Sequence, residues 1–203
     1  MSTDARRTEI LETVQQVLRA RGFAGTSMLA VATAARTSKE TLYRLFGDRR
    51  GLFAALVRHN ADTVNAELVQ ALSSDRPPEE VLPQLGRGLA TLLLGDRSVT
   101  INRAVIADAS ASGELGEILA ASGRGTTGPL IMRYLESQRA RGRLEFPSVE
   151  EAFEVFLGLL LRDRQVRRLL NVLPPPSKSE IDDLADRATA YFMRLFAPAP
   201  AVK

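Results

Sequence analysis

The stretch at residues 23–53 reads FAGTSMLAVATAARTSKETLYRLFGDRRGLF and decides the fold of this 203-residue chain. Its apolar spacing predicts two short helices that are separated by a tight turn at residues 36–37. Two consecutive hydroxyl residues, Thr26 and Ser27, are placed to cap the first helix. Residues 37–40, Thr-Ser-Lys-Glu, have the spacing of a capping box at the start of the second helix. Because helices this short bury too little apolar surface to be stable alone, they need flanking helices.

Longer amphipathic helices are predicted on both sides of this stretch, at residues 4–21 and 48–72. The N-terminal helices then form a helix-turn-helix, whose second short helix has a polar outer side. That side consists of Ser38, Lys39, Thr41, Tyr43 and Arg44. Such a helix fits the major groove of duplex DNA, where the two cations neutralise phosphates and the hydroxyls fix the register. An ordinary helical corner with a solvated polar face is the alternative interpretation.

Residues 9–53 resemble the DNA-binding domain of TetR-type transcriptional regulators. The matching residues fall in one ungapped register and are Ile10, Leu11, Leu18, Arg21, Gly22, Phe23, Thr26, Ser27, Val31, Ala32, Ala35, Ser38, Lys39, Thr41, Leu42, Tyr43, Phe46, Leu52 and Phe53. The resemblance implies an N-terminal domain that binds an operator in double-stranded DNA, an all-helical ligand-binding and dimerisation domain, and repression that a small molecule relieves. The polar pattern and the resemblance together predict DNA contacts from Thr26, Ser27, Arg36, Ser38, Lys39, Glu40, Thr41, Tyr43, Arg44 and Arg49.

Four positions depart from the family pattern. Arg36 occupies the turn position that glycine holds in the family, and a left-handed backbone there disfavours a β-carbon by roughly 1 kcal/mol. Thr37 stands where an apolar residue is usual, and Leu29 where a basic residue is common. Glu40 either completes the capping box, which is the favoured interpretation, or accepts a hydrogen bond from cytosine N4, or repels phosphate. These departures leave open a second interpretation. The chain would then be a helical binding or scaffolding protein whose helix-turn-helix domain no longer reads DNA.

The rest of the chain is predicted to be helical, because apolar residues recur at helical spacing and no alternating strand pattern interrupts them. The predicted fold class is all-α, with a three-helix helix-turn-helix domain at 1–50, a helical ligand-binding and dimerisation domain at 51–197, and a disordered tail at 198–203. Residues 123–128, GRGTTG, have the spacing of a dinucleotide fingerprint, but they follow a helical pattern and not a strand. They are predicted to form a helix-ending turn before a helix that opens at Pro129.

Two binding sites and two further helix starts are predicted in the larger domain. Apolar residues of its central helices predict a pocket for a small, apolar ligand, although the same residues suit a plain core. They are Leu85, Leu89, Ile101, Val105, Leu130, Tyr134 and Phe153. Two apolar C-terminal helices with capping boxes at 148–151 and 177–180 predict a homodimer interface, because helix-turn-helix proteins usually read two half-sites. Its predicted residues are Phe156, Leu160, Leu184, Ala188, Tyr191 and Leu195. Closing the monomer core is the alternative role of these helices.

Composition and charge narrow the range of possible functions further. The net charge is +3, and residues 1–50 hold nine Lys or Arg against five Asp or Glu, so positive charge is concentrated in the predicted DNA-binding head. The chain has no Cys, and its single histidine, His59, has no acid among the helical neighbours Ala55, Asn60 and Thr63, so no metal site is predicted. No catalytic residue, cofactor or membrane span is predicted. The protein is expected to be a cytoplasmic regulator and not an enzyme.

Overall fold

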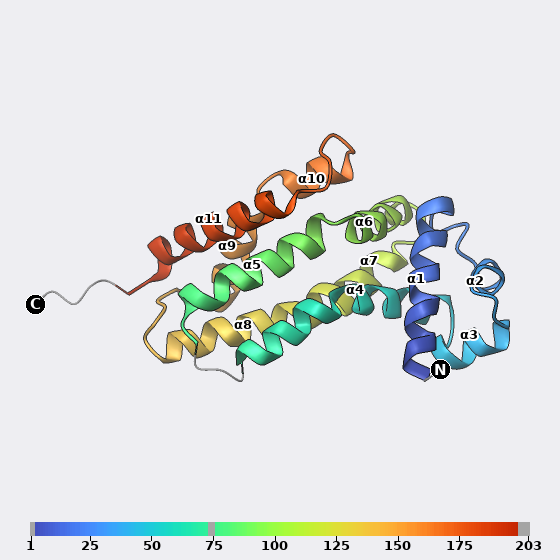
Figure 1. Ribbon diagram of the computed structural model, residues 1–203, viewed down its shortest axis with the longest axis horizontal. Helices are drawn as coiled ribbons and strands as arrows, with labels where there is room; N and C mark the ends of the chain where they lie inside the picture. Colours follow the sequence, from blue (N-terminus) through green and yellow to red (C-terminus); the bar gives the residue numbers. More distant parts are fainter. Residues whose placement is uncertain (1–2, 73–75, 199–203) are drawn as a thin grey trace, which may run out of the picture. The chain divides into compact units, whose positions relative to one another are not determined.

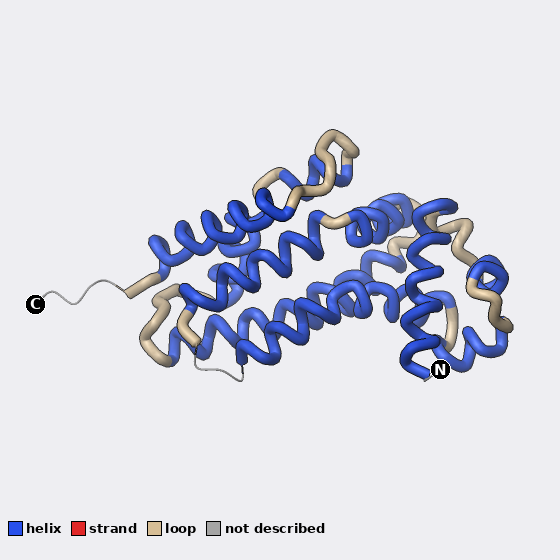
Figure 2. Tube along the Cα trace, viewed as in Figure 1, coloured by secondary structure: helices blue, strands red, loops and turns tan. Residues whose placement is uncertain are grey.

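The computed structural model describes residues 3–72 and 76–198, which form helices joined by turns and loops (Figures 1 and 2). The helices are α1 (Thr3–Arg21), α2 (Met28–Ala34), α3 (Lys39–Phe46), α4 (Arg49–Leu72), α5 (Pro78–Leu94), α6 (Asp96–Ala109), α7 (Glu114–Leu119), the π-helical turn η1 (Ala120–Arg124), α8 (Gly125–Ala140), α9 (Val149–Leu161), α10 (Arg164–Leu169) and α11 (Lys178–Phe196). The described residues contain no strand, so the predicted all-α fold is confirmed. None of the described helices combines the length and apolar character that crossing a membrane requires.

Contacts divide the chain into two compact units. Unit 1 consists of Met1–Asp62 and Asp96–Thr126, and unit 2 consists of Thr63–Gly95 and Thr127–Lys203. The first boundary falls inside α4, and both α6 and α7 belong to unit 1 although they follow α5 in the chain. The division into functional domains at residues 50 and 197 stays a prediction. Residues 199–203 of the predicted tail lie outside the described residues.

One side of each helix of unit 1 contributes to the apolar core of that unit. The apolar stripe predicted for α1 is buried throughout and consists of Ile10, Leu11, Val14, Val17 and Leu18. From α3, Leu42 and Phe46 are buried, whereas Leu45 is half-buried. α6 and α7 complete the same core with Ile101, Ala104, Leu115 and Ile118. Because α2 and α3 are too short to be stable alone, this shared core is what holds them in place.

Unit 2 packs α5, α8, α9 and α11 around a second apolar core. The ring of Phe192 lies edge-to-face with that of Phe156 at 5.5 Å between centroids, and with that of Phe196 at 4.9 Å. α5 and α11 approach closely at Gly86, where an added β-carbon would lie 3.0 Å from the β-carbon of Ala185. The aromatic contact between Phe156 and Phe192 therefore joins α9 to α11, and Gly86 lets α11 pack closely on α5.

The predicted helix starts of the C-terminal pair are confirmed to different degrees. Ser177 Oγ accepts the backbone N–H of Glu180 at 3.3 Å, and the backbone N–H of Ser177 donates to the Glu180 carboxylate at 2.9 Å, which completes the capping box. This backbone hydrogen bond holds the pKa of Glu180 below its usual value. At the start of α9, Ser148 Oγ accepts the backbone N–H of Glu151 at 3.0 Å, which is one half of a box.

The glycine-rich segment at residues 123–128 is helical, so the predicted helix-ending turn is wrong. It runs from η1 into α8, and Pro129 lies inside α8 and does not open it. Thr126 supports this path because its hydroxyl donates to the carbonyl oxygens of Ser122 at 3.1 Å and Gly123 at 2.9 Å. Hydroxyl donors of this kind satisfy carbonyls where a helix departs from regular α geometry.

Candidate DNA-binding surface

The second helix of the motif, α3, is capped one residue later than predicted. Ser38 is its N-cap, and Ser38 Oγ accepts a hydrogen bond from the backbone N–H of Thr41 at 3.0 Å. The hydroxyl oxygens of the two residues are also hydrogen-bonded, at 2.9 Å. A capping box pairs the N-cap with the third helical residue, which here is Thr41 and not Glu40. The box predicted at residues 37–40 is therefore wrong.

The first helix of the motif, α2, is capped by Ser27 alone. Ser27 is exposed, and its Oγ accepts the backbone N–H of Ala30 at 3.1 Å. Thr26 is buried, and its hydroxyl donates to the carbonyl oxygen of Gly22 at 2.7 Å. This burial makes Thr26 less available for DNA than predicted, because its hydroxyl proton is given to the protein's own backbone.

The turn between α2 and α3 has a left-handed backbone at the position where the family has glycine. Arg36 has a φ of 48°, and its side chain is exposed. Arg6 of α1 supports the turn, because its Nη2 donates to the carbonyl oxygen of Ala35 at 2.8 Å. The backbone N–H of Thr37 donates to the carbonyl oxygen of Ala32 at 2.9 Å. These bonds stabilise a conformation that a β-carbon disfavours.

We expect Arg36→Gly to raise the free energy of unfolding by about 0.5–1 kcal/mol, because glycine adopts a positive φ without steric penalty. Urea denaturation followed by circular dichroism measures the change. Arg44→Gly is the matched control, since Arg44 lies inside α3 and glycine there is expected to lower stability by about 1 kcal/mol. A destabilising effect of Arg36→Gly would contradict the presence of strain at this turn.

Four side chains of α3 are exposed and available to bind a partner. Tyr43 is 51% exposed, and Lys39, Glu40 and Arg44 are exposed as well. None of these four side chains forms a hydrogen bond or an ion pair with another described residue. Their spacing of one, three and four residues places them on neighbouring positions of one helix side. Two cations and a phenol on such a side are suited to the phosphate oxygens that flank a groove.

Arg49, at the start of α4, is tied to the protein and is less available for DNA than predicted. Its Nε donates to the carbonyl oxygen of Thr26 at 3.0 Å, and its Nη2 donates to that of Phe23. The guanidinium also stacks on the Phe23 ring, 3.7 Å from the centroid. Arg49 therefore positions the segment that leads into α2, and only part of its guanidinium is left for a phosphate.

Sequence reasoning missed two arginines of α1 that hold the motif in place. Arg6 supports the turn at Ala35, as described above. Arg7 Nη1 donates to the carbonyl oxygen of Leu45 at 2.8 Å, and the Arg7 guanidinium lies 4.7 Å from the centroid of the Phe46 ring. Both contacts join segments about thirty or more residues apart, so no local pattern signals them. They fix the turn before α3 and the C-terminal end of α3 relative to α1.

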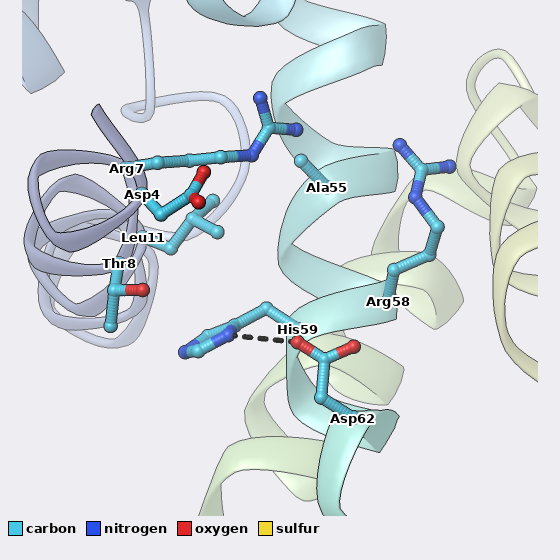
Figure 3. A pocket seen from close by; sticks show the side chains of 8 residues that line it. All are labelled: Asp4, Arg7, Thr8, Leu11, Ala55, Arg58, His59 and Asp62. Atoms are coloured by element: carbon cyan, nitrogen blue, oxygen red, sulfur yellow. Dashed lines mark hydrogen bonds and ion pairs between the residues drawn. The ribbon is translucent and has the colours of Figure 1, made fainter. Parts of the chain in front are cut away.

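A pocket of about 300 Å³ lies between α1 and α4 within unit 1 (Figure 3). It is lined by Asp4, Arg7, Thr8, Leu11, Ala55, Arg58, His59 and Asp62. The His59 ring points toward α1, and its Nδ1 lies 3.2 Å from Asp62 Oδ2, while its Nε2 lies 3.5 Å from Glu12 Oε1. The expectation that His59 lacks acidic neighbours is wrong, because one acid is three residues along α4 and the other is on α1. No group of three or more metal-ligating side chains occurs within residues 3–72 and 76–198.

The residues predicted to line a ligand pocket are divided between the two cores. Five belong to the core of unit 2 or pack against it, namely Leu85, Leu89, Leu130, Tyr134 and Phe153. Ile101 is buried in unit 1, and Val105 packs against the same core. Burial raises the pKa of the Tyr134 phenol well above its usual value, and the hydroxyl donates to the carbonyl oxygen of Arg76 at 3.4 Å. Tyr134 is thus a neutral, polar group within an apolar surround.

Four of the six residues predicted at a dimer interface lie in the chain's own core. They are Phe156, Leu160, Leu184 and Ala188. These side chains have at most 4% of their surface exposed, so they offer little area to a second chain, and their place in a dimer interface stays a prediction. Tyr191 and Leu195 of α11 are 39% and 60% exposed, and they remain available.

Two segments of the chain match known protein domains. Residues 10–56 match the domain described as bacterial regulatory proteins, tetR family. Residues 80–198 match the domain described as AefR-like transcriptional repressor, C-terminal domain. No match was found among curated proteins.

Three solved structures similar to this chain are those of regulators, two of them described as transcriptional regulators of the TetR family. One from Agrobacterium tumefaciens is 30% identical with a TM-score of 0.77, and the match covers 97% of this chain and 96% of that chain. One from Mesorhizobium loti is 25% identical with a TM-score of 0.79, covering 98% and 100%. The flavonoid-responsive regulator FrrA, 24% identical with a TM-score of 0.70 and coverage of 98% and 100%, has the same fold. With more than half of its length matched by one domain of the family, the chain belongs to the TetR family of bacterial transcriptional regulators.

Proposed function

We propose that this TetR-family chain is a sequence-specific repressor that binds its operator as a homodimer and leaves it when a small, apolar ligand binds. The observation that carries the proposal is α3, a capped helix with four exposed and uncommitted side chains. A second helix of this kind is the element that enters the major groove in helix-turn-helix proteins. The domain match to a transcriptional repressor supports the repressing role.

The proposed DNA contacts divide into phosphate and groove contacts. Lys39 and Arg44 are placed to neutralise phosphates, and the Tyr43 hydroxyl is placed to donate to a phosphate oxygen. Ser27, exposed at the start of α2, and Arg36, exposed in the turn, add contacts at the edge of this surface. Ser38 and Thr41 contribute mainly by holding the start of α3, because their hydroxyls are bonded to each other.

The proposed dimer uses the outer sides of α9 and α11. Tyr191 and Leu195 are exposed on α11, and Val155 and Leu159 are half-buried on α9. Gly158 lies between these α9 residues, and a β-carbon added to it would meet no atom within 4 Å. An interior glycine disfavours a helix by about 1 kcal/mol relative to alanine, so an open glycine at this place favours close approach by a helix of a second chain.

The proposed ligand site is in unit 2, where Tyr134 offers the polar group and Leu85, Leu89, Leu130 and Phe153 offer apolar surface. Pockets for small molecules combine apolar walls with few polar groups in this way. The fold likeness to a flavonoid-responsive regulator is a precedent for a response to a small molecule. Release of the operator then requires that the ligand binds the DNA-free state more tightly.

Fluorescence anisotropy on duplex DNA tests the proposal. The duplex is obtained by selecting bound sequences from a random library, so the operator need not be known in advance. We expect tight binding of the wild type to one selected sequence at physiological salt, with two chains per duplex. Tyr43→Ala is expected to weaken this binding by roughly 5- to 150-fold, because one well-placed contact contributes about 1–3 kcal/mol.

Tyr43→Phe is the matched control, because it removes the hydroxyl and keeps the ring. It is expected to lose less affinity than Tyr43→Ala, and both variants are expected to unfold at the wild-type temperature, since Tyr43 is half exposed. If the wild type selects no sequence, and it binds all duplexes as weakly as Tyr43→Ala does, the head is not a DNA reader. The alternative of a helical binding or scaffolding protein would then replace the proposal.

A further inference from the structure

Glu40 is a free acceptor at the N-terminal end of the helix that is proposed to read DNA. It is the second residue of α3 and is exposed. Ser38 and Thr41 complete the cap without it. Arg44 stands four residues later, at the spacing of a helical ion pair, yet Glu40 pairs with neither Arg44 nor any other described residue. Within residues 3–72 and 76–198, therefore, this carboxylate has no partner.

A carboxylate at this place discriminates between bases. Residues at the N-terminal end of a recognition helix are the ones that contact base edges. In the major groove the donors are the amino groups at cytosine N4 and adenine N6. The amino group of adenine stands beside the acceptor N7, and guanine presents the two acceptors N7 and O6, which repel a carboxylate. Cytosine presents its donor with no acceptor beside it on the same base, so it is the base that a carboxylate matches.

We propose that Glu40 accepts a hydrogen bond from the N4 amino group of one cytosine in each half-site, and thereby requires a C·G pair at that position of the operator. The inference rests on the proposed function, because it requires α3 to enter the major groove. Lys39 and Arg44 lie beside Glu40 on the exposed side of α3 and offset the repulsion between its carboxylate and the phosphates. The two cations thus contribute affinity for DNA of any sequence, and Glu40 contributes selectivity for one base.

Three selections from a random duplex library compare wild type, Glu40→Ala and Glu40→Gln. The wild type is expected to select cytosine at one position of each half-site. Glu40→Ala is expected to accept any base there and to keep its preferences elsewhere. Glu40→Gln is expected to shift the preference toward adenine, because an amide both accepts from N6 and donates to N7. An unchanged base preference in both variants overturns the inference.

A base analogue tests the hydrogen bond itself. In the operator that the wild type selects, the proposed cytosine is replaced by 2-pyrimidinone, which keeps the ring and lacks the N4 amino group. Anisotropy is expected to show a loss of roughly 5- to 150-fold for the wild type, the range of one base contact. Glu40→Ala, which has no contact to lose, is expected to change by less than about twofold. Effects on the duplex itself are common to both proteins and cancel, so equal losses overturn the inference.

Lys39→Gln is the control for charge, because a lost phosphate contact weakens binding to all sequences alike and lowers the salt slope by about one. If Glu40→Ala strengthens binding to every duplex equally, Glu40 only repels phosphate, and the inference is overturned. If Glu40→Ala lowers the unfolding temperature and leaves the base preference unchanged, Glu40 serves the helix end alone, and the inference is again overturned. A wild type that selects no sequence contradicts the proposed function and not merely the role of Glu40.

Discussion

Replacing Phe192 by alanine is expected to lower the free energy of unfolding by about 3–5 kcal/mol. Phe192 is fully buried in α11, and its ring contacts those of Phe156 on α9 and Phe196 edge-to-face. Alanine would leave a cavity that these rings cannot fill without moving, and both aromatic contacts would be lost. Urea denaturation measures the loss, which is a large share of the roughly 5–15 kcal/mol by which native proteins are stable.

Two further variants make the Phe192 result specific. Phe192→Leu keeps much of the volume and is expected to lose clearly less stability than Phe192→Ala. Asp183→Ala removes an exposed side chain from the same helix and is expected to change the free energy of unfolding by less than about 0.5 kcal/mol. A Phe192→Ala protein as stable as Asp183→Ala would show that α11 does not pack on α9 as described.

Arg49→Ala is expected to lower the free energy of unfolding by about 2–4 kcal/mol, although Arg49 was predicted as a DNA contact. The substitution removes two hydrogen bonds from a charged donor, to the carbonyl oxygens of Thr26 and Phe23, and the stacking on the Phe23 ring. DNA binding is expected to weaken as well, because α2 then loses the segment that places it. Denaturation and anisotropy on the same samples measure both effects.

Arg49→Lys separates positioning from charge. Lysine keeps the positive charge but lacks the planar fork that reaches two carbonyl oxygens and stacks on a ring. We expect Arg49→Lys to lose most of the stability that Arg49→Ala loses, while the salt dependence of DNA binding stays close to that of the wild type. Wild-type stability in both variants, with weaker DNA binding in Arg49→Ala only, would make Arg49 a simple phosphate contact.

The helices and their buried sides could be predicted because apolar periodicity depends only on local geometry. Ile10 and Leu18 lie eight residues apart on α1 and face the same core, as helical spacing requires. The same reasoning could not separate a core from an interface. Phe156 and Leu184 are buried by their own unit, whereas Leu195 is exposed on the same apolar helix as Leu184. Periodicity shows that a residue lies on the apolar side of its helix. It does not show whether the same chain or a second chain buries that side.

Helix starts could be predicted where one residue is able to cap and not where two compete. Ser177 lies between Pro176 and Lys178, so no adjacent hydroxyl competes with it, and its capping box forms in full. Thr37 and Ser38 are both suitable caps, and the left-handed backbone at Arg36 precedes them. The structure uses Ser38, which shifts the register by one residue and leaves Glu40 with no partner in the described part of the chain. One residue of register thus changes an acid from a structural group into a candidate base reader.

Contacts distant in sequence could not be predicted at all. Arg49 reaches back 23 residues to Thr26, and His59 reaches back 47 residues to Glu12. Side chains as long as arginine adopt such contacts only after the helices are placed, so their partners follow from tertiary structure and not from local spacing. The predicted role of Arg49 and the missing neighbours of His59 have this common origin.

The membership of α6 and α7 in unit 1 limits how the head of this regulator can be exchanged. Their apolar side chains fill the same core as α1, α2, α3 and the first turns of α4. A chimaera joined at residue 50 would bring in a foreign head without those side chains and expose apolar surface to water. To rewire the protein to another gene, an engineer would transplant 1–62 together with 96–126, or recode only the exposed side chains of α3 and leave the scaffold intact.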